Sequence, residues 1–352
     1  MNITEIKERG LEFEQLGRLP QDILEFIYEQ KLFKLFTANE LGGKNLDLVE
    51  GIKVFQQIAA LDGNVGWLVT IGTGGNAFIP AFSQEMCERI FSPKEAVIAG
   101  SGYPTGIAIK VEGGYVVTGQ WKYCSGSDYA TTFTMNCLIE QNGMKTENII
   151  SCSLDRQDVE VLHDWRAMGL KATASHTIRV NNVWIPQEAT FQIGTIRNNY
   201  GNSVHTFPFT TFAEASFLSV CLGITENLLE EAFILIKQRN HAAKRNHAAN
   251  RTERMGALQF LFMQQQKHFK QCEQQFYTTL SGYWQKHQQD QSLTEEELMQ
   301  FTQMSKEIAA ACIEIANKLI RNLGMDAITE TSRLNRIWRN LYTAAQHGFL
   351  TP

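Results

Sequence analysis

The chain has 352 residues, of which 43% are hydrophobic and 20% are charged, and its formal net charge is −5. A chain of this length and composition can bury sizeable cores in two or three cooperating domains and is not disordered. The negative charge and the lack of a basic stripe argue against a nucleic-acid partner. No stretch approaches the roughly 18 apolar residues that a membrane span requires, so we expect no membrane association.

The cysteines and histidines give no sign of a metal or a disulfide framework. The seven cysteines contain no CxxC pair and no metal-ligand spacing, and the eight histidines are dispersed along the chain. Most of the cysteines lie in apolar runs, which favours buried, reduced thiols. The first residues, Met1 to Lys7, lack the basic and then apolar pattern of a signal peptide. We therefore expect a cytoplasmic protein without a metal.

Residues 1–95 are predicted to be helical. Apolar positions after Leu19-Pro20 recur at helical spacing, and proline is favoured at the start of a helix. Residues 48–61 repeat this spacing, and a further helix is expected after Asp62-Gly63. Leu41-Gly42-Gly43 is predicted to form a turn between the helices.

The period of the apolar residues changes to two from about residue 96 to residue 195. Glycine- and asparagine-containing pairs at Gly113-Gly114, Asn142-Gly143 and Asn181-Asn182 lie between or beside the apolar runs as predicted turns. Short strands at this spacing predict a small barrel or sandwich. The strand candidates are residues 96–101, 106–111, 115–118, 131–140, 149–154 and 176–180.

The remainder of the chain, from about residue 205, is again predicted to be helical. Its periodic segments are long and rich in glutamine, and such helices usually pack as a bundle. They cover residues 213–239, 251–288 and 295–322, with a shorter helix near residues 333–347. The predicted fold is thus α+β and mainly α. It has a helical domain (1–95), a central β-barrel or sandwich (96–204) and a C-terminal four-helix bundle (205–352).

Two turns in the β region are the most informative features of the chain. Residues 121–130 have a strand pattern that stops in a small hydroxylic turn around Ser125-Gly126. Residues 168–175 contain Gly169, Thr173 and Ser175. These residue types are expected where a backbone approaches a flat, polar ligand closely. Although Ser-Gly alone is ordinary turn chemistry, two such turns can offer backbone N–H groups and hydroxyls to a ring with polar edges, such as a flavin.

The pairing of these turns resembles the flavin-contacting signature of the acyl-CoA dehydrogenase superfamily. The form Ser-Gly-x-x-x-Ala, which starts at Ser125, resembles its oxygenase branch, the two-component flavin-dependent monooxygenases. Asp62-Gly63-Asn64-Val65-Gly66-Trp67 and Val183-Trp184-Ile185-Pro186 resemble further family segments. Arg339-Asn340 followed by His347 resembles the ending of the oxygenase branch. The order and spacing of these segments extend the resemblance over nearly the whole chain.

The resemblance implies roles for individual residues. Ser125 is expected to hydrogen-bond near the flavin N5 atom. His347 is expected to act near neutral pH, either as an acid/base on the substrate or as a hydrogen-bond partner of a flavin adduct. Trp165 is expected either to stack on the ring or to pack at the edge of the β-domain. Arg239 lies in a basic cluster, residues 237–254, which is either a solvated helix end or a contact with a cofactor phosphate. The other expected flavin contacts are Tyr123, Cys124, Gly126, Thr173 and Ser175.

The branch of the superfamily depends on the catalytic base. Dehydrogenases use a carboxylate, but His347-Gly348 occupies the place where that glutamate would fall. Glu330 precedes Arg339, whereas the catalytic glutamate of the dehydrogenases would follow it. Glu214 is either an alternative base or a polar residue near a helix start. The oxygenase pattern is also incomplete, since the stretch from Thr73 to Asn76 lacks the histidine that this branch often carries.

The predicted function is oxidation of a small aromatic or apolar substrate with reduced flavin and O2. The chain has no Rossmann-type dinucleotide loop, so FMN or FAD would arrive reduced from a separate reductase. An aromatic cluster would line either the substrate pocket or an interdomain core. It comprises Phe207, Phe209, Phe212 and Phe217.

Two other functions remain open. One is a FAD-dependent acyl-CoA dehydrogenase that is served by an electron-transfer flavoprotein and desaturates a thioester. The other is a non-catalytic flavin-binding or interaction protein of the same fold. In every case the superfamily implies a homodimer or homotetramer.

Overall fold

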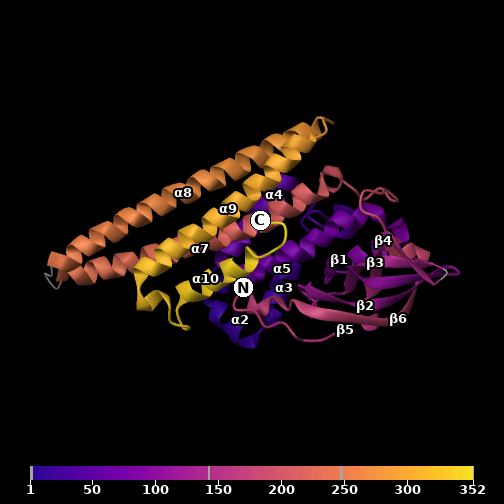
Figure 1. The fold of residues 1–352 in the computed structure, drawn as a ribbon, viewed down its shortest axis with the longest axis horizontal. Coiled ribbons are helices and arrows are strands. Elements are labelled where there is room, and N and C mark those ends of the chain that lie inside the picture. The colour runs from indigo at the N-terminus through magenta and orange to yellow at the C-terminus, as the bar shows by residue number, and fades with distance from the viewer. Residues whose placement is uncertain (1–2, 142, 246–248, 352) are drawn as a thin grey trace.

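The structure, a computed structural model, describes residues 3–141, 143–245 and 249–351. Asn142 of one predicted turn and the side chains of residues 241–252 lie outside the described part, including the basic side chains of Lys244, Arg245 and Arg251. Figure 1 shows a sheet at one end of the molecule and long helices from the C-terminal part of the chain extending away from it. The N-terminal helices lie between the two.

The N-terminal helices begin at residues that cap them. Asp47 and Glu50 form a reciprocal capping box at one helix, and the Asp62 carboxylate accepts from the N–H groups of Asn64 and Val65 at the next. These caps confirm the helices expected over residues 48–61 and after Asp62. The helices are α1 (Ile3–Glu8), α2 (Gly10–Leu16), α3 (Gln21–Glu29), α4 (Leu48–Leu61), α5 (Gly63–Gly74) and α6 (Gln84–Phe91).

One sheet of seven strands follows, in the order β5-β6-β2-β1-β3-β4-β7. Strands β1 and β3 are parallel, and the other neighbours are antiparallel. The edge strands β5 and β7 are not paired with each other in the described residues, so the sheet is open. Of the predicted barrel or sandwich, the closed barrel is therefore not formed. The strands are β1 (Ile98–Val111), β2 (Gly114–Cys124), β3 (Thr132–Gln141), β4 (Met144–Asp155), β5 (Glu160–Val161), β6 (His176–Pro186) and β7 (Thr190–Phe191).

Two predicted strand breaks are irregularities inside continuous strands. The candidates at 96–101 and 106–111 form the single strand β1, whose pairing with β3 shifts register between Ser101 and Gly106. The expected turn at Asn181-Asn182 lies inside β6, where Asn182 has φ 53°. A bulge interrupts the alternation of side chains without ending the strand, so in sequence it looks like a turn.

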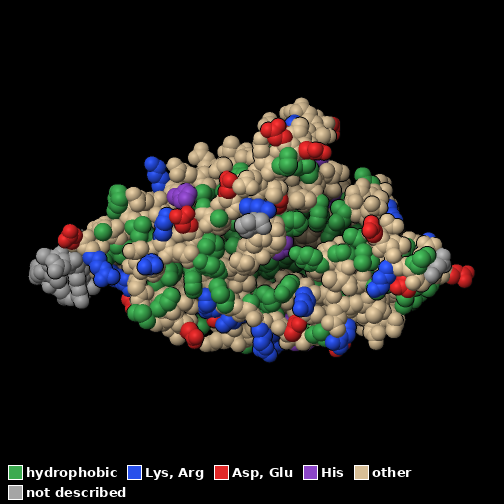
Figure 2. All heavy atoms as spheres, viewed as in Figure 1, with side chains coloured by type: hydrophobic (Ala, Val, Ile, Leu, Met, Phe, Trp, Pro, Cys, Tyr) green, Lys and Arg blue, Asp and Glu red, His purple; other side chains and the backbone are tan. Residues whose placement is uncertain are grey.

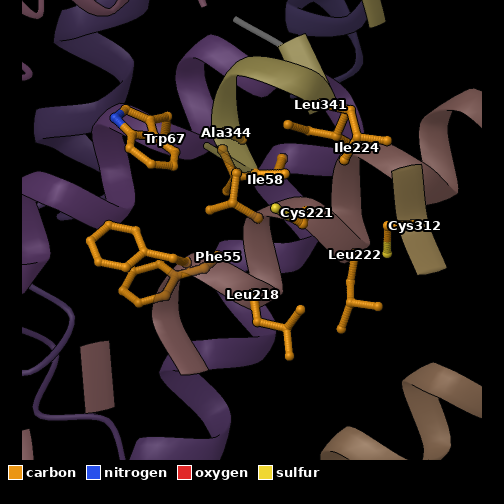
Figure 3. Packing of buried hydrophobic residues seen from close by; sticks show 14 of the residues in the cluster. Phe55, Ile58, Trp67, Leu218, Cys221, Leu222, Ile224, Cys312, Leu341 and Ala344 are labelled. Atoms are coloured by element: carbon orange, nitrogen blue, oxygen red, sulfur yellow. The ribbon is translucent and has the colours of Figure 1, made fainter. Parts of the chain in front are cut away.

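The C-terminal helices are α7 (Phe209–Arg245), α8 (Ala249–Gln288), α9 (Glu295–Leu323) and α10 (Arg333–Ala344). Helix α7 packs against α4, α5, α8, α9 and α10 and is therefore the central helix. Figure 3 shows Phe55 of α4, Trp67 of α5 and Leu341 of α10 gathered around its side chains Leu218 and Cys221. At the α4 crossing, a Cβ on Gly223 would lie 2.2 Å from the carbonyl oxygen of Gln56, so only glycine permits this approach.

After α10 the chain turns back toward the sheet. Leu350 is buried in the main core, and a Cβ on Gly348 would lie 3.3 Å from the phenol oxygen of Tyr103 in β1. Figure 2 shows hydrophobic side chains around a hollow beside this end of the chain. This return places His347 between the helices and the sheet. Among the described helices, none combines the length and apolarity needed to cross a bilayer.

Candidate functional site

The two turns singled out in the sequence are in direct contact. The N–H of Gly126 donates to the carbonyl of Thr173 at 2.8 Å, and the N–H of Ser127 donates to the carbonyl of Ala174 at 3.2 Å. The Ser127 hydroxyl also donates to Ala174, at 2.6 Å. We call residues 123–127 and 170–175 the joint. The expectation that these turns offer their N–H groups to a ligand is wrong for Gly126 and Ser127, because both groups are used across the joint.

Three hydroxyls cross the joint in a continuous row. The Trp67 indole N–H donates to Ser125 Oγ at 2.9 Å, and Ser125 Oγ lies 2.7 Å from Ser175 Oγ. Ser175 Oγ lies 2.7 Å from Thr173 Oγ1, which donates to the carbonyl of Leu170 at 2.8 Å. We call Ser125, Ser175 and Thr173 the hydroxyl chain. All three are buried.

The second turn is held in an unusual conformation by two buried amides. Leu170 and Ala174 have φ of 49° and 46°, a left-handed region that side chains other than glycine seldom occupy. The N–H of Leu170 donates to Asn340 Oδ1 of α10 at 2.8 Å, and the N–H of Ala172 donates to Asn64 Oδ1 of α5 at 3.0 Å. Both asparagines belong to segments that resemble the family, but no local pattern in the sequence indicates this role.

Arg339 adds a charged connection between α10 and the same turn. Its guanidinium binds both carboxylate oxygens of Glu14 at 2.9 Å and also donates to the carbonyl of Met168. Lys171 pairs with Glu14 at 3.1 Å. A Cβ on Gly169 would lie 2.1 Å from the carbonyl oxygen of Arg339, so the close approach of α10 requires glycine there. The Arg339-Asn340 pair therefore positions the turn.

His347 lies in an aromatic stack beside the joint. Its ring lies 3.8 Å from that of Phe217 at 27°, with Phe349 at 5.5 Å and Trp67 at 5.8 Å. Trp67 itself stacks on Phe217 at 5.3 Å. Because Trp67 also donates to Ser125, the stack connects His347 to the hydroxyl chain.

Burial within this stack lowers the pKa of His347 to about 4. The ring is therefore neutral at pH 7. The N–H of Phe349 approaches Nδ1 at 3.4 Å, which places the ring proton on Nε2. The role of His347 as an acid/base stays a prediction, and the neutral ring fits the other expected role, that of a hydrogen-bond donor.

The remaining predicted contacts of the first turn have varied surroundings. Tyr123 is 67% exposed, has φ 63°, and meets the Trp165 ring edge-on at 6.3 Å. The Cys124 thiol is buried in the core of the sheet, so only its backbone faces the joint. The Trp165 indole donates to the carbonyl of Leu170 at 2.9 Å, which ties it to the second turn. Gly126 has φ 82°, as the turn requires.

The structure does not bring Arg239 to the joint. This residue lies toward the end of α7 that points away from the sheet (Figure 1), where it pairs with Asp326. The ion pair is the described role of this side chain within one subunit, and its contact with a cofactor phosphate stays a prediction.

The two glutamates considered as alternative bases have other surroundings. Glu214 is buried on α7 and accepts from the Thr302 hydroxyl of α9 at 2.6 Å, and burial raises its pKa. Glu330 is exposed between α9 and α10.

The stretch that lacks the expected histidine is tightly packed. The Thr73 hydroxyl donates to the carbonyl of Leu32, and the Asn76 amide donates to that of Phe33. A Cβ on Gly75 would lie 2.6 Å from Ile98 Cβ, so no imidazole fits there.

The predicted aromatic cluster divides between two places. Phe207, Phe209 and Phe212 line a cavity of about 300 Å³, together with small and aliphatic residues such as Ala77 and Ile193. None of the residues that line it is an acid, a lysine or an arginine. Phe217 is absent from this cavity and lies in the stack with His347.

Asp128, His163 and His176 form a cluster that the sequence analysis missed. Their ligand atoms lie within 4.8 Å of one another, and His163 Nε2 is 3.1 Å from Asp128. However, the N–H of Trp165 donates to His176 Nδ1 at 3.0 Å, so the proton of the neutral ring is on Nε2. A metal ligand needs a lone pair at that atom. The arrangement therefore favours a hydrogen-bonded cluster over a cation site.

Comparisons with known proteins identify relatives of the chain. Residues 215–352 match the family model described as acyl-CoA dehydrogenase, C-terminal domain. The oxygenase subunit HsaA of a flavin-dependent monooxygenase from Rhodococcus jostii is 29% identical over 194 residues, which are 55% of this chain and 50% of that protein. Indole-3-acetate monooxygenase from Acinetobacter baumannii is 23% identical over 349 residues, which are 98% and 88% of the two chains. The chain thus spans about half the length of the first relative in its match.

Solved structures confirm the fold. The crystal structure of 3-HSA hydroxylase from Rhodococcus sp. RHA1 matches with a TM-score of 0.92 at 20% identity, over 99% of this chain and 91% of that chain. TdsC from Paenibacillus sp. A11-2, solved with FMN and indole, matches with a TM-score of 0.73 at 18% identity, over 98% and 92% of the two chains. The fold is therefore mainly helical with a sheet and resembles that of acyl-CoA dehydrogenases, as predicted.

Proposed function

Because the chain is related to the flavin-dependent monooxygenases of the acyl-CoA dehydrogenase superfamily, we propose that it is the oxygenase component of a two-component monooxygenase. It receives reduced FMN or FAD from a separate reductase and uses O2 to hydroxylate a small aromatic substrate. The observation that carries this proposal is the hydroxyl chain at the joint, with the neutral His347 stacked beside it.

The residues at the joint fit a flavin ring. Ser125 would offer its oxygen to the polar edge of the ring, supported from behind by Ser175 and Thr173, and the backbone of Tyr123 and Gly126 borders Ser125. When bound, the reduced flavin supplies the electrons that activate O2. The surrounding aromatic side chains exclude water from the reacting groups. His347 donates a hydrogen bond from Nε2 to the substrate or the ring.

The parallel rings of the aromatic stack favour a substrate that is flat and neutral. Phe217 lies within 29° of parallel to Trp67, within 27° of His347 and within 19° of Phe349. Flat aromatic molecules add to such a stack in offset geometry. The uncharged lining of the cavity at Phe207, Phe209 and Phe212 suits an apolar molecule better than a phosphate-bearing thioester.

We also propose an assembly, a location and a domain division for the chain. Large hydrophobic side chains are exposed on α7 and α8, among them Phe233, Phe260 and Met263. Exposed apolar surface of this kind supports a homodimer or homotetramer through the bundle.

All seven cysteines are free and buried, which supports a reducing, cytoplasmic location. The helical, β and bundle parts would form domains at 1–95, 96–204 and 205–352.

The test begins with flavin. The purified protein is titrated anaerobically with reduced FMN and FAD, then given O2 and a panel of phenols and indoles, and product is compared with hydrogen peroxide. We expect flavin binding and hydroxylated product. His347→Ala should lower product formation by roughly 10²–10³-fold, the usual effect of removing one positioned donor, with hydrogen peroxide in its place. His268→Ala is the control and should have no effect, because His268 lies in α8, which contributes no described residue to the joint or to the aromatic stack.

Two results would contradict the proposal. If acyl-CoAs reduce an artificial electron acceptor and Glu214→Gln abolishes this activity, the protein is a dehydrogenase. If neither FMN nor FAD binds in either redox state, the chain is a binding or interaction protein of this fold.

A further inference from the structure

Strand β1 contains a wide bulge that carries a tyrosine. The pairing of β1 with β3 is interrupted between Ser101 and Gly106, so residues 102–105 of β1 lie opposite a single residue of β3, Asn136. Extra residues of this kind bend a strand and change the direction in which a side chain points. Tyr103 is one of these extra residues.

The bulge is held near both of its ends. The Asn136 amide donates to the carbonyl of Gly102 at 2.8 Å, and the Thr105 hydroxyl donates to the carbonyl of Gln120 in β2 at 2.6 Å. These bonds fix the backbone on either side of Tyr103 to the neighbouring strands. The tyrosine is therefore presented from a supported backbone and not from a free loop.

The Tyr103 phenol lies beside the segment that carries His347. A Cβ on Gly348 would lie 3.3 Å from the phenol oxygen, which is tighter than an ordinary van der Waals contact. His347 is the preceding residue, and its ring stacks on Phe217 and packs near Trp67. Figure 2 shows the hollow beside this end of the chain. Tyr103 thus approaches the candidate site from the sheet, whereas His347 approaches it from the C-terminal segment.

Within the described residues, neither the Tyr103 hydroxyl nor His347 Nε2 makes a hydrogen bond. The Tyr103 side chain is 66% exposed, so its oxygen is available to a ligand. His347 accepts at Nδ1 from the N–H of Phe349, which leaves its Nε2–H to donate. A phenol hydroxyl can both donate and accept. A ligand with two polar groups therefore has one partner on each side of Gly348.

We propose that Tyr103 is a specificity-determining residue, whose hydroxyl binds a second polar group of the aromatic substrate in addition to the group that meets His347. The preferred substrate is then a phenol or an indole that carries a further hydroxyl or carbonyl group. Tyr103 contributes to substrate binding and takes no part in the oxygen transfer. This inference rests on the proposed function, since it requires that an aromatic substrate is oxidised beside His347.

The test uses pairs of compounds that differ by one hydroxyl group, such as tyrosol and para-ethylphenol, or hydroxyindole and indole. The values of kcat and KM are measured with reduced flavin and O2 for the wild type and for Tyr103→Phe. The variant keeps the ring and loses only the oxygen. It should raise KM for the hydroxylated compound by roughly 2- to 13-fold, the value of one net hydrogen bond. KM for the other compound and kcat for both should stay unchanged.

Binding of the same pairs gives a second measurement that does not depend on turnover. Dissociation constants measured by calorimetry, with and without flavin, should change as the KM values do. Tyr342→Phe is the matched control, because it also removes one phenol oxygen, but that oxygen accepts from Asn317 of α9. Its KM values should equal those of the wild type. A purely structural role of Tyr103 would change both members of a pair alike.

Two outcomes overturn the inference, and they are distinguishable. If the wild type oxidises these compounds but Tyr103→Phe leaves both KM values of a pair unchanged, or raises both equally, Tyr103 does not bind the second polar group. If the wild type binds neither FMN nor FAD and oxidises none of the compounds, the proposed function itself is wrong and the inference falls with it.

Discussion

Tyr123 shows backbone strain at a single residue of the candidate site. It has φ 63° where the pairing of β2 with β6 shifts register between Trp121 and Cys124. A residue with a side chain adopts this conformation at a cost of about 1–2 kcal/mol. Such strain persists only where the surrounding structure imposes it, and it often marks functional sites.

We predict that Tyr123→Gly unfolds with a free energy about 1 kcal/mol higher than Tyr123→Ala. Both variants lose the ring, which is 67% exposed and contributes little burial, but only glycine adopts the positive φ without strain. Urea denaturation of the two variants gives the difference. An alanine variant as stable as the glycine variant would show that the backbone at this position is not strained.

At the scale of elements, the second turn depends on helices that are distant in sequence. Asn64 of α5 and Asn340 of α10 accept from its N–H groups, and Arg339 binds its carbonyl at Met168. The packing of the helices therefore sets the geometry of the joint. A change in either asparagine should affect flavin binding as well as stability.

We predict that Asn340→Ala lowers the free energy of unfolding by about 1–3 kcal/mol, because the buried N–H of Leu170 loses its partner. It should also weaken flavin binding. The control is Asn227→Ala, since Asn227 is equally buried but donates to Leu61 and does not contact the joint. The measurements are denaturation and flavin titration of both variants. Equal loss of flavin affinity in the two would mean that α10 stabilises the fold without positioning the turn.

The elements were largely predictable from the sequence, and the exceptions have local causes. The apolar spacing over residues 48–61 and the long periodic segments near the C-terminus are local signals, so they predicted α4 and the bundle helices correctly. The bulges in β1 and β6 were misread as breaks, because alternation is lost at a bulge even though pairing continues. Whether the sheet closes into a barrel depends on pairing between its two edge strands, which no local sequence pattern specifies.

At the scale of the whole molecule, the site exists only when distant segments meet. The joint connects Trp67 to Ser125 and Leu170 to Asn340, and the C-terminal segment brings His347 against Phe217. The sequence suggested the two turns and His347 through a family resemblance. It could not reveal the hydroxyl chain or the low pKa of His347, because both depend on contacts between residues far apart in the chain.

The packing of distant segments against one another also buries titratable groups. The free energy of unfolding should therefore depend on pH. Burial lowers the pKa of His205 and of His347 to about 4, from an unfolded value near 6.5. Between these two values the unfolded chain binds more protons than the folded chain. Each histidine therefore contributes stability that is present above about pH 6.5 and is lost as the pH falls toward 4. The buried carboxyls Asp62 and Glu214 have raised pKa values and act in the opposite direction.

We predict that the free energy of unfolding falls less steeply in His347→Gln than in the wild type between pH 6.5 and 4. The difference should reach at most about 1.4 kcal/mol per pH unit, the limit for one proton. Glu214→Gln should make the fall steeper, because the folded protein then lacks a carboxyl whose protonation stabilises it in acid. Urea denaturation at a series of pH values measures all three curves. Parallel curves for the wild type and His347→Gln would mean that His347 titrates alike in both states, and that the stack against Phe217 does not hold its ring neutral.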